Sequence, residues 1–223
     1  IDVSSDGDTV LVSAGTYVEN LSVSANITLQ SVDGRDNTII DGSQAGSVII
    51  ASSCHINGFS IQNGLAEDGG GVNIANSNVV INNSWITNNY SNDNSAAIST
   101  EQSNLTINNT IISHNFGTST ASSVMKAVNS SVEFYDALIS NNQSEARMIW
   151  STASSGGGVL EFNNVTMSNN SSTGSGVGSI DFDGFSSIIN NSIIWNNSLP
   201  IRVIQVDDLS ISYSNIEGGE SGV

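Results

Sequence analysis

The feature that most constrains this chain is a repeated pattern in which an apolar residue is followed, after one intervening residue, by two asparagines. Ile86-Thr87-Asn88-Asn89 shows the pattern in full, and further copies lie on both sides of it. The leading apolar residues are separated by 25, 26, 27, 28, 27 and 22 positions. They are Ile61, Ile86, Ile112, Ile139, Met167, Ile194 and Ile216, of which Ile61 and Ile216 lead degenerate copies (Asn63-Gly64 and Gly218-Gly219) and Ile112 leads His114-Asn115. Such a repeat is typical of solenoid proteins, in which each repeat forms one turn and stacks on its neighbours.

A second apolar ladder runs in step with the first, five residues ahead of it. Its members are Ile56, Ile81, Ile107, Phe134, Phe162, Ile189 and Ile211. A mostly apolar position also stands two residues before each member, and that spacing places both side chains on one face of a strand. With a third apolar segment, each repeat holds three short strands. This predicts an all-β, right-handed parallel β-helix of about eight coils, spaced ~4.8 Å apart. An antiparallel sandwich is the alternative, but it needs hairpin turns rather than a cycle of nearly constant length.

The asparagine pairs have a physical reason in such a coil. A bend between two short strands needs a residue at positive φ, and asparagine is the non-glycine residue that tolerates this conformation best. Stacked asparagine side chains also hydrogen-bond from one coil to the next. We therefore expect structural bends at Asn89, Asn115, Asn142, Asn170 and Asn197.

The charge of the chain limits its partners. It carries 21 Asp and Glu against 4 Lys and Arg, a net charge of -17, and no basic residues cluster in the sequence. This argues against nucleic acid and anionic membranes as partners, and no stretch reaches the roughly 18 apolar residues that a membrane insertion needs. The single Cys54 excludes an internal disulfide and a cysteine-based zinc site. We expect no cofactor and no metal site, with loose calcium binding by carboxylates as the open alternative.

Two segments carry a family resemblance. Residues 7–42 read GDTVLVSAGTYVENLSVSANITLQSVDGRDNTIIDG, and residues 213–219 read YSNIEGG. Both resemble secreted bacterial proteins of the pectin-lyase-like superfamily of right-handed β-helices. The resemblance implies an extracellular or cell-surface location and one β-helix domain over residues 1–223. Within that domain we expect a cap and opening turn over 1–26, stacked coils over 27–216 and a truncated end over 217–223.

The start of the chain fits the same interpretation. In that family a short capping helix usually precedes the opening turn, and Ile1-Asp2 is similar to its last residues. Because the chain starts at Ile1 rather than Met, we expect it to be part of a larger secreted protein.

The catalytic motifs of the superfamily find only partial counterparts. Its pectin methylesterases carry an Asp-Phe-x-Phe-Gly strand, which the segment 181–185, DFDGF, matches in composition but not in order. Asp181 and Asp183 share a strand face and are candidates for an acid and a base, or for calcium ligands. Its polysaccharide lyases use Lys or Arg, and here Lys126 and Arg147 lie on adjacent coils. The one Asp-Asp pair, at 207–208, lacks the companion motifs of the hydrolases.

One surface pattern points to binding. Alternation places Trp85 outward, and the equivalent outward positions in other coils include Ile111, Leu138 and Ile193. A stacked apolar stripe on a secreted rod suggests a partner, a covering segment or a flat carbohydrate. The alternative is that a tight bend turns these side chains partly into the core.

The absence of a convergent catalytic set makes a non-catalytic module our main functional prediction. It would be an extracellular structural or adhesive domain that binds polysaccharide or associates with itself, and not an enzyme. The alternative is a carbohydrate-active enzyme, a polysaccharide lyase, hydrolase or esterase, that uses Asp181, Asp183, Lys126 or Arg147.

Overall fold

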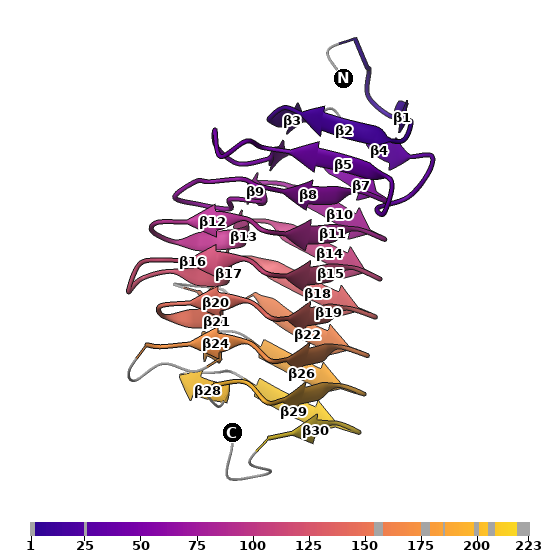
Figure 1. The fold of residues 1–223 in the computed structure, drawn as a ribbon. Coiled ribbons are helices and arrows are strands. Elements are labelled where there is room, and N and C mark those ends of the chain that lie inside the picture. The colour runs from indigo at the N-terminus through magenta and orange to yellow at the C-terminus, as the bar shows by residue number, and fades with distance from the viewer. Residues whose placement is uncertain are drawn as a thin grey trace.

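The chain forms a parallel β-helix, shown from the side in Figure 1. The structure is a computed structural model that describes residues 3–24, 26–153, 158–174, 179–184, 186–198, 201–204 and 208–217. Over these residues all secondary structure is β-strand, and every strand pairs in parallel with its counterpart in the next coil. The predicted all-β parallel β-helix is therefore confirmed.

Three long sheets run the length of the rod. Sheet A has nine strands: β1 (Thr9–Val12), β4 (Thr28–Ser31), β7 (Cys54–Asn57), β10 (Asn78–Asn82), β14 (Asn104–Asn108), β18 (Ser131–Tyr135), β22 (Val159–Asn163), β26 (Ser186–Asn190) and β29 (Asp208–Ser212). Sheet B also has nine: β2 (Gly15–Val18), β5 (Thr38–Asp41), β8 (Ser60–Gln62), β11 (Trp85–Thr87), β15 (Ile111–Ser113), β19 (Leu138–Ser140), β23 (Thr166–Ser168), β27 (Ile193–Trp195) and β30 (Asn215–Ile216). Sheet C has eight: β3 (Leu21–Val23), β6 (Ile49–Ala51), β9 (Val72–Ala75), β13 (Ser95–Glu101), β17 (Ser123–Val128), β21 (Arg147–Thr152), β25 (Ile180–Asp183) and β28 (Ile201–Ile204).

A fourth, shorter sheet was not predicted. Sheet D consists of two-residue strands: β12 (Tyr90–Ser91), β16 (Phe116–Gly117), β20 (Gln143–Ser144) and β24 (Ser171–Ser172). Tyr90 and Phe116 stack edge to face across it, with ring centroids 6.4 Å apart. The other positions are small or polar, so the sequence has no alternation of hydrophobic and polar residues that would predict these strands.

The core consists of the apolar ladders. Ile56, Ile81 and Ile107 are in register on sheet A and are fully buried. Phe134 and Phe162 continue the ladder with rings stacked 5.1 Å apart at an interplanar angle of 7°. Stacking identical residues at the strand spacing keeps each side chain in contact with its counterpart, so the core is continuous along the rod.

Cys54 takes a rung of the neighbouring ladder, directly opposite Val79. Burial raises the pKa of its thiol to about 11. The thiol therefore stays protonated and unreactive at neutral pH.

The two residues of each asparagine pair have different roles, which corrects the predicted bends. Positive φ occurs at the first residue of each pair, as at Asn88 (φ 52) and Asn141 (φ 56), and not at the second residues that we predicted. Those second residues, Asn89, Asn115, Asn142, Asn170 and Asn197, form a ladder of amides in which each donates to the next, over 2.9 to 3.0 Å. The bend therefore points the first side chain to solvent and the second into the rod.

The opening segment forms part of the coil stack. Residues 1–26 were expected to be a cap and opening turn, but β1, β2 and β3 pair in parallel with β4, β5 and β6. The first coil thus starts at Thr9. The predicted remnant of a capping helix, residues 1–2, lies outside the described residues, as do residues 218–223. No helix of the described chain is long and apolar enough to cross a membrane.

Candidate functional site

The outward face of sheet C brings the basic residues of the chain together. One column of outward positions runs from coil to coil in strict register. It reads Asn73, Ser99, Lys126, Trp150, Asp181 and Arg202. Since parallel coils are ~4.8 Å apart, neighbours in this column are in side-chain contact range. Residues that are scattered in the sequence therefore form one continuous strip.

A buried carboxylate holds two arginines in this strip. Asp181, with its side chain 1% exposed, accepts from Arg147 Nε at 2.7 Å. Arg202 approaches it through two atoms, with Nη2 2.6 Å from Oδ2 and Nε 3.0 Å from Oδ1. An unpaired buried carboxylate would cost several kcal/mol. The two guanidiniums remove that cost, and Asp181 in turn fixes their position.

Arg202 is a permanent cation here. Its hydrogen bonds to Asp181 raise the pKa of the guanidinium above its usual value; burial opposes this rise, while the charges of Asp181 and Asp183 add to it. The Arg202 side chain is 36% exposed, so this charge also faces solvent.

Trp150 organises the other two cations. Lys126 Nζ lies 5.5 Å from the centroid of the Trp150 ring, and Arg147 Cζ lies 4.8 Å from it. Cation–π contacts of this kind contribute about 0.5–1 kcal/mol each at exposed sites. We call Lys126, Arg147, Trp150 and Arg202, with Asp181 beneath them, the basic patch.

The basic patch contains three of the four Lys and Arg residues in the sequence. Arg35 is the fourth. Its Nη1 donates to the backbone carbonyls of Ser84 and Asn109, which lie in turns that connect sheet A to sheet B. No basic cluster is visible along the sequence, but the fold creates one. An overall charge of -17 makes this local concentration of positive charge stand out.

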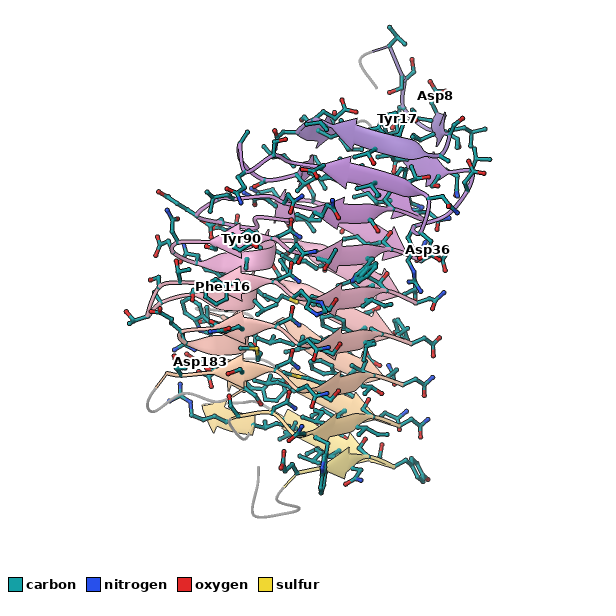
Figure 2. All side chains as sticks on the ribbon, viewed as in Figure 1. Asp8, Tyr17, Asp36, Tyr90, Phe116 and Asp183 are labelled. Atoms are coloured by element: carbon teal, nitrogen blue, oxygen red, sulfur yellow. The ribbon has the colours of Figure 1, made fainter. Side chains whose placement is uncertain are left out.

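The two predicted carboxylates occupy different environments. Asp181 is buried in the ion pairs, whereas Asp183, two residues further along β25, is half-buried. Figure 2 shows Asp183 on the same side of the rod as Tyr90 and Phe116. Asp183 is thus the more accessible of the two carboxylates, and Asp181 positions the arginines. Residue 185 of the DFDGF segment and residue 207 of the Asp-Asp pair lie outside the described residues.

The predicted metal chemistry remains open. Among the described residues, no group of three or more His, Cys, Asp or Glu side chains is arranged to hold a metal ion. Asp181 uses both of its oxygens for arginines. The expectation of no cofactor and no metal site, with loose calcium binding as its alternative, therefore stays a prediction.

The outward stripe lies on sheet B, on a different face from the basic patch. Trp85, Ile111 and Leu138 are in register and half-buried, while Ile193 is 47% exposed. Trp85 Nε1 donates to Ser113 Oγ over 2.7 Å, which holds the ring against the sheet. The stripe as a binding surface stays a prediction.

Sequence reasoning missed Arg202 and the role of Asp181 as its partner. Asp181 and Arg202 are 21 residues apart, and Arg147 and Asp181 are 34 apart. Neither spacing matches the repeat of about 26, because the connections on this side of the rod vary in length. The only available signal was that Arg202 falls in the third apolar segment of its repeat.

The sequence matches no family model and none of the curated proteins compared with it. Solved structures superpose on the chain to different degrees. A pectin methylesterase from Aspergillus niger superposes with a TM-score of 0.60 at 13% identity, over 98% of this chain and 80% of that one. PemA, a pectin methylesterase from Erwinia chrysanthemi, gives 0.46 at 12% identity, over 91% and 73%. An alginate lyase from a Paenibacillus species gives 0.30 at 12%, over 96% and 94%.

The chain therefore has the pectin-lyase-like β-helix fold that the sequence resemblance implied. The same comparison contradicts our main functional prediction, a non-catalytic structural or adhesive module that is not an enzyme, because the structures that superpose with a TM-score of 0.60 are of a pectin methylesterase. The alternative, a carbohydrate-active enzyme, is better supported. At 13% identity the likeness itself establishes only the fold, so the choice of reaction has to rest on the residues of this chain.

Proposed function

We propose that this chain is a carbohydrate-active enzyme that hydrolyses carboxyl esters on an acidic polysaccharide, with the basic patch and Asp183 as its site. The observation that carries the proposal is the gathering of Lys126, Arg147 and Arg202 around Trp150 and Asp181. A chain with so few cations places three of them on one face, and a buried carboxylate and an aromatic ring hold them there.

The basic patch favours an anionic ligand. The rest of the rod carries most of the 21 Asp and Glu residues and repels a polyanion. A polyuronate would therefore bind where a fixed guanidinium reaches solvent, and Arg202, 36% exposed on this face of sheet C, offers the planar donor geometry that a carboxylate accepts. The charge distribution thus orients the polymer as well as binding it.

The reaction needs a base that the substrate can reach. Asp183 is half-buried and lies on the same face of β25 as Asp181. In the proposed step its carboxylate takes a proton from water as the water oxygen attacks the ester carbonyl. The neighbouring Arg202 stabilises the negative charge that develops on the carbonyl oxygen. The C–O bond to the alcohol then breaks, and the proton leaves with the alcohol.

Ester hydrolysis is the reaction that Asp183 as a base and Arg202 as a charge stabiliser can carry out, and the structures with a TM-score of 0.60, both described as pectin methylesterases, agree with that choice. An acidic polysaccharide as partner and an extracellular location belong to the same proposal. A general base at the position of Asp183 accounts for about 10²–10⁴-fold in rate.

Methanol release from methyl-esterified pectin tests this function. We expect Asp183→Asn to lower kcat at least 100-fold without a change in melting temperature. Asp136→Asn is the matched control because Asp136 is an exposed turn residue at φ 53, a conformation that asparagine tolerates. It should keep full activity.

Two results would contradict the proposal. One is a wild-type chain that releases no methanol, with or without added calcium. The other is an Asp183→Asn variant that is as active as the wild type. Formation of unsaturated sugar ends in place of methanol would assign the site to a lyase instead.

A further inference from the structure

A second feature of sheet C adjoins the basic patch. A cavity of about 200 Å³ opens over β9, β13 and β17, lined by Asp68, Asn73, Ala75, Ser99, Glu101, Lys126 and Val128. Lys126 belongs to both, because its Nζ lies 5.5 Å from the Trp150 centroid and 3.4 Å from Asp68 Oδ1. The cavity and the basic patch therefore form one continuous surface along the rod.

The charge of the cavity is opposite to that of the patch. Asp68 and Glu101 contribute two carboxylates, and Lys126 contributes one ammonium group, which is already paired with Asp68. A ligand carboxylate here would face a net negative lining and would have to compete for Lys126. Ligand hydroxyl groups, in contrast, can donate to both carboxylates.

The remaining lining suits a single sugar ring. Asn73 and Ser99 add an amide and a hydroxyl, and Ala75 and Val128 add small apolar surfaces. The volume is below the ~300–1,000 Å³ of pockets for drug-sized ligands, so the cavity accommodates one ring and not an oligosaccharide.

We propose that this cavity is a subsite for an uncharged pyranose residue of the same polysaccharide whose charged residue lies on the basic patch. This inference rests on the proposed function, which identifies the ligand as an acidic polysaccharide. Two kinds of sugar residue have the required chemistry: a neutral hexose, or a uronate whose carboxyl group is esterified. The chain would then select a polymer in which charged and uncharged residues alternate over a short distance along the rod.

Calorimetric titration of the 223-residue chain tests the subsite. Asp183→Asn serves as background, so that ester probes stay intact. The probes are three hexasaccharides. The first is fully unesterified oligogalacturonate, and the second is the same oligomer with every carboxyl group but one esterified. The third has neutral hexoses in place of the esterified residues of the second. We expect the second probe to bind more tightly than the first by about threefold or more, and this preference to shrink at high salt.

The decisive variant is Glu101→Gln, which removes one negative charge from the cavity and keeps the side-chain shape. Glu101 is exposed on β13 and is not part of the basic patch. The preference for the second probe should fall about threefold in this variant. Glu133→Gln removes the same charge on the outer face of sheet A and should leave the preference unchanged.

An equal effect of both substitutions, or no preference in the unsubstituted cavity, would overturn the subsite. The third probe identifies the source of the uncharged residue: binding as tight as the second indicates a neutral hexose, and weaker binding an esterified uronate. Because these are binding measurements, they separate the two proposals. A chain that shows the Glu101-dependent preference but releases no methanol would refute the ester hydrolysis alone.

Discussion

Two buried polar systems in this protein differ in a way that separates fold from function. The amide ladder from Asn89 to Asn197 repeats in five coils, and each member makes nearly the same hydrogen bonds to the next. The cluster of Asp181 with Arg147 and Arg202 occurs once. Both satisfy buried polar groups, but a repeated network serves the coil that it belongs to. A network that occurs once, and that positions charges at the surface, needs a reason beyond the coil.

The largest effect is expected at Asp181. Replacement by Ala leaves two guanidiniums facing each other without their carboxylate. Since Arg147 and Arg202 are partly exposed, we expect a loss of about 2–3 kcal/mol in unfolding free energy, below the range for a fully buried pair. Methanol release should fall as well. Urea denaturation and the esterase assay together test this, and unchanged values in both would remove the distinction between the two networks.

A smaller effect, on stability alone, is expected in the amide ladder. The Asn142 side chain donates to the Ile112 carbonyl over 2.9 Å and accepts from the Asn115 backbone N–H over 3.0 Å. Asn142→Ala leaves these buried groups unpaired, so we expect a loss of about 2 kcal/mol in unfolding free energy. Asn141→Gly, at the exposed residue of positive φ in the same pair, should be close to neutral. A loss of activity per folded molecule in Asn142→Ala would show that the ladder also shapes the site.

The smallest effect should be a gain in stability. Ser187 lies on the ladder of Cys54, Val79, Leu105, Val132 and Leu160, and its buried Oγ has no hydrogen-bond partner in the described part of the chain. Ser187→Val places an apolar side chain at this position, like those at the other positions of the ladder. It should stabilise the protein by about 1 kcal/mol, because it removes an unsatisfied hydroxyl and buries two methyl groups. A lower melting temperature would mean that this rung cannot accept the larger side chain.

The same distinction explains what could be predicted from the sequence. Ile56, Ile81 and Phe134 recur at nearly constant spacing, so their ladder and the parallel coil could be predicted. Asn89 was found by the same regularity: the predicted hydrogen bonding of stacked asparagines is confirmed, whereas the bend lies at Asn88 and not at Asn89. Arg202 and Asp181 meet because variable connections bring them to neighbouring coils, and their spacing of 21 residues gives no periodic signal. The sequence placed Lys126 and Arg147 on adjacent coils but gave no sign that Arg202 and Asp181 join them, so no convergent set was visible and the non-catalytic prediction was wrong.

The position of the Asp181 cluster also bears on how the rod loses its structure. In a stack of coils each turn touches only its neighbours, so unfolding can start at one end and proceed coil by coil. Arg147 on β21 and Arg202 on β28 belong to coils two steps apart, and both bind Asp181 on the coil between them. These bonds link three consecutive turns through one carboxylate. Fraying from the C-terminal side has to break the Arg202–Asp181 bonds before the next turn can leave, and the Arg147–Asp181 bond then still joins the two turns that remain.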